Sequence, residues 1–265
     1  LGYRDAPLMD ATKRLTRADA VLMESTYGDR LHRPIEETID ELTEVFGTAR
    51  AAQGNVLIPA FTVGRTQDLL YLMAEHFDRW RLDDWTIFLD SPMGIKATDI
   101  YSRYRHLFAA RLFEPKSDNP ELPNLYATRT AEESMTINEI ESGAIVIAGS
   151  GMCTGGRILH HLKNNIWRPQ CHVVIVGYQA IGTPGRALVD GAKTFRMGGE
   201  KIAVNASIHT LGGFSAHASQ SQLTDWASNF KEPHPDLFLI HGEEEAKLTL
   251  QKSFAEQGWP ARIPG

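Results

Sequence analysis

The chain has 265 residues, of which 42% are hydrophobic and 23% charged, and its formal net charge at pH 7 is −6. A chain of this length and composition can bury a substantial core, in one large domain or in two smaller ones. The negative balance excludes a protein that coats nucleic acid through bulk charge, because that needs clustered Lys and Arg, although a local basic groove stays open.

Signals for membrane insertion, secretion and cysteine-based sites are missing from the sequence. No apolar run approaches the roughly 18 to 20 residues that span a bilayer, and the N-terminus has no charged-then-apolar signal pattern. The two cysteines, Cys153 and Cys171, form neither a CxxC motif nor a cluster with histidine. We therefore expect a cytoplasmic protein with no membrane partner. The opening Leu1-Gly-Tyr-Arg-Asp5 has no initiator Met, so we also expect a fragment of a longer protein.

The first quarter of the chain alternates between apolar runs and amphipathic segments. Ala20 to Met23 is an apolar run that predicts a strand closed by Glu24. From Pro34 to Gln53 apolar residues recur every three or four positions, with Pro and acidic residues in the first turn, which predicts a helix. Asn55 to Ala60 predicts a buried strand, and Phe61 to Gln67 turns into a second helix.

The same alternation continues to the end of the chain. The further predicted strands are Thr86 to Pro92, Leu125 to Thr128, Gly143 to Ala148, Cys171 to Tyr178, Lys201 to Val204 and Leu237 to Ile240. The further predicted helices are Gly94 to Phe108, Ile158 to Trp167, Gln220 to Phe230 and Glu244 to Gln257. Strands that alternate with helices predict an α/β fold, with a parallel-rich sheet and helices on both of its faces.

Three turns place glycine and arginine near the start of a helix, where free backbone N–H groups and a guanidinium suit a phosphate. The strongest is Gly149-Ser-Gly-Met-Cys-Thr-Gly-Gly-Arg157, which leads from a strand into a helix. The structural reading of each is a tight turn that only packs. The candidate phosphate-binding residues in these turns are Arg65, Ser150, Gly151, Gly155, Gly156, Arg157, Gly185 and Arg186.

The order of strand, Gly-rich turn and helix also occurs in dinucleotide-binding folds. Gly149 to Gly155 does not match G-x-G-x-x-G in full, and no acidic residue after the next strand has the spacing that holds a ribose. The strand that begins at Cys171 ends in Gly177-Tyr-Gln179 instead. The sequence therefore argues against a dehydrogenase.

Ionisable residues follow three short apolar runs. Glu24 closes the first strand, His217 ends the stretch Ser207-Ile-His-Thr-Leu-Gly-Gly-Phe-Ser-Ala-His217, and His241 follows Leu239-Ile240. Strands of an α/β sheet deliver such side chains to its rim. An imidazole there is a metal ligand, a general acid or a packed core histidine, and the convergence of three segments favours chemistry.

These stretches resemble the motifs of the β-CASP branch of the metallo-β-lactamase superfamily, the nucleases of RNA 3′-end processing and the RNase J-like enzymes of bacterial RNA maturation and decay. The similar stretches are Glu24-Ser-Thr-Tyr-Gly, Ile58-Pro-Ala-Phe-Thr-Val-Gly-Arg65, the turn before Arg157, Gly182-Thr-Pro-Gly-Arg186 and Ser215-Ala-His217. The resemblance covers nearly the whole chain. It implies a β-CASP domain over residues 35–199, and the C-terminal part of a metallo-β-lactamase αββα domain over residues 1–34 and 200–265.

The resemblance further implies zinc-dependent hydrolysis of phosphodiester bonds in single-stranded RNA. His241 matches a zinc ligand, His217 the acid that protonates the leaving oxygen, and Glu24 the carboxylate that orients and charges His217. Ser215 is a further RNA-binding candidate. The family holds two zinc ions through an upstream His-x-His-x-Asp-His cluster, a further His and a bridging Asp, and this sequence contains no such cluster. We therefore expect incomplete zinc binding and no activity from this chain alone, and a homodimer is compatible with its features.

One motif departs from the family pattern, and one alternative function stays open. Ser-Ala-His usually continues Ala-Asp in the family, whereas here it continues Ala218-Ser219, which bears on the hydrogen bonding around His217. The alternative is a non-catalytic module of the same fold that binds RNA or a protein partner. The missing upstream ligands favour that alternative for this chain, and the retained Glu24, His217 and His241 favour an active whole protein.

Overall fold

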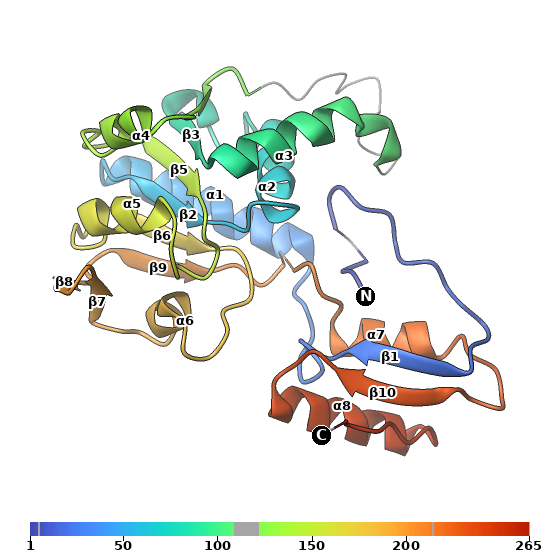
Figure 1. Cartoon of the computed structure of the whole chain (residues 1–265). Coiled ribbons are helices and arrows are strands. Elements are labelled where there is room, and N and C mark those ends of the chain that lie inside the picture. Colours follow the sequence, from blue (N-terminus) through green and yellow to red (C-terminus); the bar gives the residue numbers. More distant parts are fainter. Residues whose placement is uncertain (5, 109–121, 214, 265) are drawn as a thin grey trace. The chain divides into compact units, whose positions relative to one another are not determined.

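The computed structural model describes residues 1–4, 6–108, 122–213 and 215–264. They form two compact units: unit 1 comprises Leu1–Arg33 with Ser215–Gly265, and unit 2 comprises Pro34–Phe214. Unit 2 is thus one continuous stretch that interrupts unit 1 in the sequence (Figure 1). In the described part of the chain, no helix is long and apolar enough to cross a membrane.

A parallel sheet forms the centre of unit 2. The described strands lie side by side in the order β4, β3, β5, β2, β6 and β9 (Figure 1). Their bounds are β2 Val56–Pro59, β3 Thr86–Asp90, β4 Leu125–Ala127, β5 Ala144–Ala148, β6 His172–Ile175 and β9 Ser207–Thr210. All the pairings between these neighbours are parallel, so the carboxyl ends of the strands share one edge of the sheet.

Helices cover both faces of this sheet. The apolar residues of α1, α2 and α3 share a core with the face of β2 that holds Ile58. Those of α4, α5 and α6 share a second core with the face that holds Leu57. The bounds are α1 Ile35–Ala51, α2 Arg65–Glu75, α3 Pro92–Arg103, α4 Ala131–Ile137, α5 Ile158–Asn165 and α6 Pro184–Val189, with single 3-10 turns η1 Leu82–Asp84 and η2 Arg105–Leu107.

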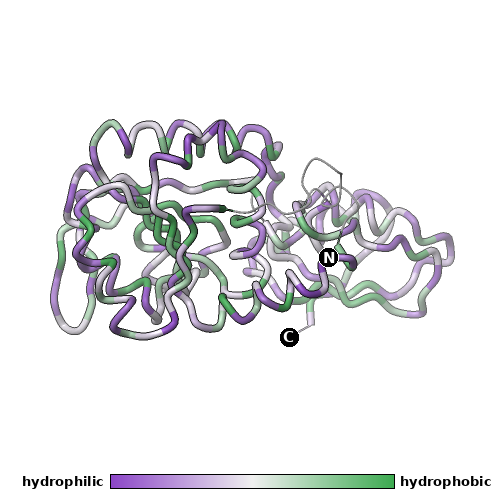
Figure 2. The backbone as a smooth tube through the Cα atoms, turned by 90° about the horizontal axis from the view of Figure 1, so that it is seen from above, coloured by the Kyte–Doolittle hydropathy of each residue, from purple (hydrophilic) through white to green (hydrophobic). Residues whose placement is uncertain are grey.

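The predicted α/β fold is confirmed, including the parallel-rich sheet with helices on both faces. β2 and β5 are buried along their whole length, because helices cover both sides of each strand. Figure 2 shows hydrophobic residues in green through the middle of unit 2 and hydrophilic ones in purple around its outside. The first helix begins after Pro34, and Glu36 and Glu37 in its first turn complement the positive end of the helix dipole.

The end of unit 2 lies later in the chain than the predicted domain boundary at residues 199 and 200. β8 (Glu200–Ala203) does not return to unit 1, because it pairs antiparallel with β7 (Thr194–Met197). β9 then adds to β6 as the outermost strand of the large sheet. These ladders keep the chain in unit 2 as far as Phe214. The other boundary, between Arg33 and Pro34, lies one residue from its predicted position.

Unit 1 is built on a parallel pair of strands, β1 (Ala20–Glu24) and β10 (Asp236–Ile240), with helices α7 (Gln220–Ala227) and α8 (Glu244–Glu256) (Figure 1). Alternate residues of β1 point into the unit, so its odd-numbered positions are buried while Leu22 is 68% exposed. The buried core of the unit includes Val21, Met23, Leu223, Leu237, Leu239, Leu250 and Phe254.

Candidate functional site

The parallel pairing of β1 and β10 brings Glu24 and His241 to the same end of the strand pair. Glu24 is opposite Ile240 in the ladder, and His241 is the next residue. The carbonyl oxygen of His241 accepts hydrogen bonds from Ser25 N at 3.1 Å and from Thr26 Oγ1 at 3.3 Å. The chain segments that leave the two strands are therefore tied to each other directly beside the two ionisable side chains.

Gly242 allows this close approach. A Cβ atom at position 242 would lie 2.6 Å from the carbonyl oxygen of Ser25, a separation that real Cβ atoms do not show. The hydroxyl of Ser25 also donates to the carbonyl oxygen of Ile240 over 2.8 Å. His241 itself has a φ of 47°, in the left-handed region where non-glycine residues are uncommon and cluster at functional sites. Packing around Gly242 therefore sets the position of the His241 imidazole.

A hydrogen bond joins the two predicted catalytic residues. Nδ1 of His217 donates to Oε2 of Glu24 over 2.7 Å, although the two residues are 193 positions apart in the chain. The other carboxylate oxygen accepts from Ala218 N at 3.3 Å. Ser215 Oγ accepts from His217 N at 3.0 Å, which stabilises the turn that presents the imidazole. RNA binding by Ser215 stays a prediction.

The charge of Glu24 is maintained by its partner. Burial by itself raises the pKa of Glu24, but the hydrogen bond and charge of His217, the N-terminal amino group and Thr26 together outweigh burial and leave the pKa below its ordinary value. The side chain of Glu24 is 10% exposed and that of His217 is 34% exposed. Because Glu24 occupies Nδ1, the ring presents Nε2, which has no hydrogen-bond partner among the described residues.

His32 is a third imidazole in this region, and the sequence analysis did not single it out. Its Nε2 donates to the main-chain carbonyl oxygen of His217 over 2.8 Å. The rings of Tyr3 and Tyr27 make edge contacts with it, at centroid distances of 5.0 and 4.9 Å. Burial lowers the pKa of His32, so the ring is neutral at pH 7. The signal in the sequence is only a histidine eight residues after Glu24, which is too weak to assign a role.

His241 lies beside His217 and is open to a ligand. The two ring centroids are 5.6 Å apart and the ring planes differ by 28°. The ring nitrogens of His241 have no partner among the described residues, so they suit a metal ion. A catalytic zinc site takes three protein ligands. The described residues contain no group of three or more His, Cys, Asp or Glu that could hold an ion, so they do not complete such a site.

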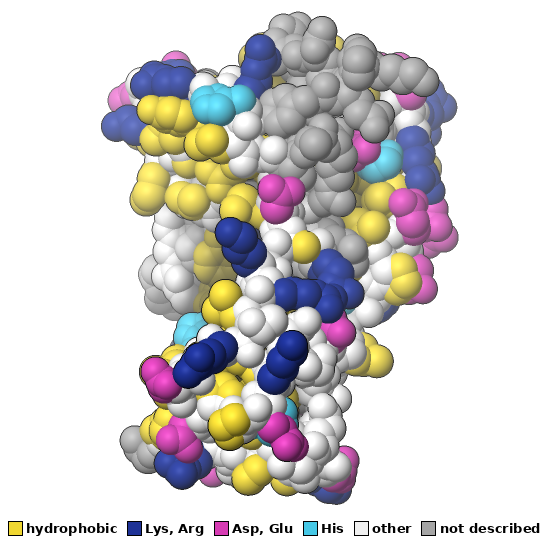
Figure 3. Space-filling model, turned by 90° about the vertical axis from the view of Figure 1, so that its right-hand side faces the viewer, with side chains coloured by type: hydrophobic (Ala, Val, Ile, Leu, Met, Phe, Trp, Pro, Cys, Tyr) yellow, Lys and Arg dark blue, Asp and Glu magenta, His cyan; other side chains and the backbone are white. Residues whose placement is uncertain are grey.

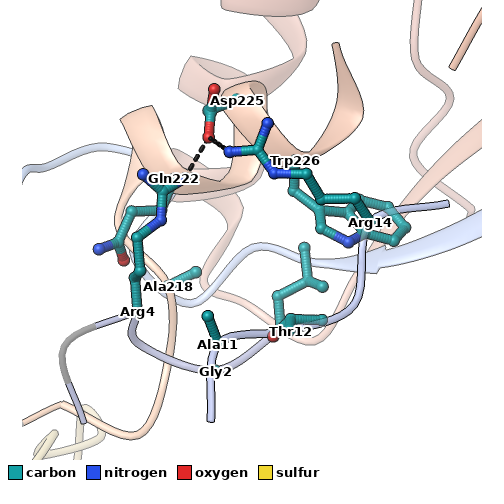
Figure 4. Close-up of a pocket in the computed structure, with 10 residues that line it drawn as sticks. Gly2, Arg4, Ala11, Thr12, Arg14, Ala218, Gln222, Asp225 and Trp226 are labelled. Carbon is teal, nitrogen blue, oxygen red and sulfur yellow. Dashed lines mark hydrogen bonds and ion pairs between the residues drawn. The ribbon is translucent and has the colours of Figure 1, made fainter. Parts of the chain in front are cut away.

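A cavity of about 220 Å³ in unit 1 has Ala218, the neighbour of His217, in its wall (Figure 4). Arg4 and Arg14 converge there on the carboxylate of Asp225, and Arg14 lies 3.1 Å from it. Two guanidinium groups thus share one carboxylate, which leaves a positive balance among the three side chains. This cluster could not be predicted from the sequence, because its three residues do not form a motif and Asp225 lies more than 200 positions from the two arginines.

In unit 2 the Gly-rich turn joins β5 to α5. Ser150 Oγ accepts from Thr154 N at 3.1 Å, which closes a tight turn. Gly156 has a φ of 74°, and a Cβ there would lie 2.4 Å from the carbonyl oxygen of Gly149, so only glycine fits. The space around Gly155 is open. Phosphate binding stays a prediction for Ser150, Gly151, Gly155 and Gly156.

Arg157 points into unit 2 and makes internal hydrogen bonds. Its Nη1 donates to Oδ1 of Asp90 at 2.6 Å and to the carbonyl oxygen of Thr128 at 3.1 Å, and its Nη2 donates to the carbonyl oxygen of Arg129 at 3.1 Å. The side chain of Arg157 is 20% exposed and that of Asp90 is fully buried. The phosphate contact predicted for Arg157 therefore competes with a buried ion pair, and it stays a prediction.

Asp90 is the centre of a polar cluster that the sequence analysis did not single out. Besides Arg157, its carboxylate accepts from Ser134 Oγ at 2.6 Å and from Thr128 Oγ1, and it faces His161 Nε2 at 2.6 Å. Burial raises the pKa of Asp90, but these hydrogen bonds together outweigh burial and hold the pKa well below its ordinary range. The signal in the sequence is an acidic residue at the end of an apolar strand.

The other predicted phosphate ligands lie at the starts of α2 and α6. Arg65 is 6% exposed, and its Nη1 lies 3.1 Å from a carboxylate of its own helix. A Cβ at Gly185 would lie 1.8 Å from Oε1 of Gln179, so this glycine is needed for packing. Arg186 is at the surface, where its Nε donates to Asp190 at 2.9 Å. Of the two arginines, Arg186 is the accessible one.

Two family models match the chain. The Beta-Casp domain matches residues 66–188, and the Zn-dependent metallo-hydrolase RNA specificity domain matches residues 201–264. The first match lies within unit 2, and the second covers the end of unit 2 and the C-terminal part of unit 1. The second match therefore includes His217 and His241.

Several relatives match almost the whole chain. Ribonuclease TTHA0252 of Thermus thermophilus is 40% identical over 263 residues, which is 97% of this chain and 59% of that protein. The RNase J-like protein of Methanocaldococcus jannaschii is 30% identical over 97% of this chain and 59% of its own length. Transcription termination factor FttA of Pyrococcus abyssi is 33% identical over 97% of this chain and 41% of its own length. The chain thus spans between two fifths and three fifths of these relatives.

Proposed function

Because the chain belongs to the β-CASP family of metallo-β-lactamase-fold RNA nucleases, we propose that it is part of an enzyme that hydrolyses phosphodiester bonds in single-stranded RNA. The observation that carries this proposal is the hydrogen bond between Glu24 and His217, beside His241. A general acid of this kind needs a carboxylate that fixes the ring and a second ring nitrogen open to the substrate. The pair has both.

In this proposal His217 gives a proton from Nε2 to the oxygen that leaves the phosphorus atom. Glu24 is a positioning residue, since it contacts the imidazole and not the substrate. His32 holds the main chain of His217 from the other side. All three contacts are within unit 1, so the acid is prepared by residues of this chain alone.

One residue of this chain, His241, is proposed to bind zinc. The family matched over residues 201–264 is described as Zn-dependent, and the open ring of His241 fits a zinc ligand. The described residues supply no further ligands beside it, so they do not fit a complete site. We propose that the whole protein holds two zinc ions, with His241 as one ligand. When bound, zinc would activate water as a nucleophile and neutralise charge at phosphorus.

The test measures zinc content and cleavage of an end-labelled single-stranded RNA by the whole protein. We expect His241→Ala to lower both zinc occupancy and cleavage rate, because the loss of a ligand weakens the hold on an ion. The matched control is His234→Ala, an exposed histidine that precedes β10 at its other end. Unchanged zinc content in His241→Ala would contradict the ligand assignment. Binding of RNA without cleavage by the whole protein would instead favour the non-catalytic module.

For unit 2 we propose that the Gly-rich turn and the start of α6 contact RNA phosphates. Arg186→Ala is expected to weaken RNA binding and to reduce the slope of log affinity against log salt by about one, because one phosphate contact is lost. The control is Arg79→Ala, an exposed arginine of the same unit that also takes part in surface ion pairs, with Asp40 and Glu36. Binding titrations at several salt concentrations give both slopes. If the slope of log affinity against log salt were equal for Arg186→Ala and wild type, Arg186 would not contact an RNA phosphate and would only form a surface ion pair.

A further inference from the structure

An exposed aromatic side chain lies at the carboxyl edge of the large sheet. Phe61 lies two residues after the end of β2 and is 41% exposed, and Val63 is 60% exposed. The ring of Phe61 makes no contact with another of the described aromatic rings. An aromatic ring that is neither buried nor paired with its own kind is open to a planar ligand.

Two glycines and a helix start hold Phe61 in this place. A Cβ at Gly151 would lie 2.9 Å from both Cδ2 and the main-chain nitrogen of Phe61, and a Cβ at Gly177 would lie 3.3 Å from Cε2. One edge of the ring is therefore seated on glycine backbone. The carbonyl oxygen of Phe61 accepts from Thr66 N at 3.2 Å and from Thr66 Oγ1 at 2.8 Å. The ring is positioned before any ligand arrives.

The place of Phe61 in the topology is one where open α/β sheets bind ligands. β2 and β5 are neighbours in the sheet, but the chain after β2 enters α2 on one face, and the chain after β5 enters α5 on the other. Loops that diverge in this way leave a crevice at the carboxyl ends of the strands. Phe61 comes from the first loop and Gly151 from the second, so their contact lies at this divergence.

The chemistry beside the ring suits a nucleic-acid strand more than an apolar partner. Gly151 is part of the turn proposed above to hold phosphate, and the hydroxyls of Ser150 and Thr154 lie 3.0 Å apart in the same turn. Among the described residues, the N–H groups of Gly155 and Gly156 have no hydrogen-bond partner. Figure 3 shows exposed Lys and Arg side chains on the face that it views, with hydrophobic, Asp and Glu side chains among them. Because Phe61 lies against Gly151 of this turn, a base on the ring and a phosphate on the turn would belong to the same nucleotide or to neighbouring ones.

We propose that Phe61 is a stacking platform for an unpaired base of the RNA whose phosphates contact the Gly-rich turn. This proposal rests on the proposed function, because it assumes that RNA is the substrate. It adds that the substrate is single-stranded at this point, since a base paired in a duplex cannot lie on the ring. Stacking is tolerant of sequence because every base has a flat face, so the platform selects for strandedness and not for a particular base.

The experiment measures the affinity of the 265-residue chain for a ten-nucleotide oligo(A), for the matching abasic oligomer and for a duplex. Phe61→Ala is expected to weaken oligo(A) binding about 5- to 150-fold, the loss typical of one stacked base. Phe61→Leu is expected to lose most of this affinity as well, because it keeps an apolar group and removes the ring. Phe61→Trp is expected to bind at least as tightly, with its fluorescence quenched by the stacked base.

The abasic oligomer and a second aromatic residue provide the controls. Binding of the abasic oligomer should be equal for wild type and Phe61→Ala, because no base is present to stack. Trp167→Ala should leave oligo(A) affinity unchanged, since Trp167 is 51% exposed on the same unit but lies between α5 and β6, at the amino ends of the strands. No binding of any RNA by wild type would overturn the proposed function. Tight wild-type binding that Phe61→Ala and Phe61→Leu leave unchanged would overturn the platform alone.

Discussion

Replacement of His217 by alanine is expected to slow RNA cleavage by the whole protein about 10²- to 10⁴-fold and to leave zinc content unchanged. The rate falls because the leaving oxygen loses its proton donor, and the zinc stays because the proposal makes His241, and not His217, the metal ligand. The loss should shrink for a substrate whose leaving group needs no proton. Single-turnover cleavage rates on both substrates, with zinc content measured in parallel, test this prediction.

Two further variants separate the acid from its support. Glu24→Gln is expected to produce a smaller version of the same defect, because the amide still orients the ring but no longer favours its charged form. His160→Ala is the matched control, since that imidazole is exposed on α5 and its side chain takes no part in the site. If His217→Ala removed zinc while His241→Ala retained it, the two histidines would have to exchange roles.

Replacement of Asp90 by asparagine is expected to lower the free energy of unfolding by about 3 kcal/mol at pH 7, because it leaves the Arg157 guanidinium without its buried counter-charge. Asp90 has a lowered pKa in the folded chain, so the stability it contributes is present above its unfolded pKa of about 4 and is lost as pH falls towards the folded value. The difference between wild type and Asp90→Asn should therefore narrow below about pH 4.

Urea denaturation at pH 7 and at about pH 3.5 measures both effects. Asp190→Asn is the control, because Asp190 also pairs with an arginine but is 56% exposed, and an exposed pair contributes at most about 1 kcal/mol. A loss for Asp90→Asn no larger than that of the control would mean that the cluster around Asp90 adds little to the stability of unit 2. Unit 2 contains the ion pair completely, so the result does not depend on unit 1.

The fold could be predicted from the sequence wherever a segment was long and strongly patterned. The residues of α1 repeat an apolar position every three or four residues, which predicts a helix. Those of β2 and β5 are short, continuously apolar runs, which predict buried strands. The strand of β8 was predicted, but β7 and its pairing with β8 were not, because the two form a short hairpin with few buried residues. The second boundary of unit 2 was placed too early for this reason. α4 and α6 are too short for a helical period to stand out.

The candidate site likewise contains residues that a local pattern predicts and contacts that no local pattern predicts. Glu24, His217 and His241 were predicted as site residues because each ends an apolar run within a family motif, and the structure shows the contact between Glu24 and His217. The direction of Arg157 could not be predicted, because its partner Asp90 is 67 positions away and nothing local reveals which way a guanidinium turns. His32 acts through a main-chain carbonyl group, a contact that no residue pattern encodes.

Because unit 2 interrupts unit 1 in the sequence, the two segments of unit 1 are synthesised at different times. Glu24 and His217 are 193 positions apart, so at a synthesis rate of about 5–20 residues per second the histidine follows the carboxylate by roughly 10–40 s. The whole of unit 2 emerges from the ribosome in that interval and can fold as a continuous segment. The pairing of β1 with β10 cannot form until β10 has been made as well. The hydrogen bond between Glu24 and His217 therefore forms only after all of unit 2 has been made.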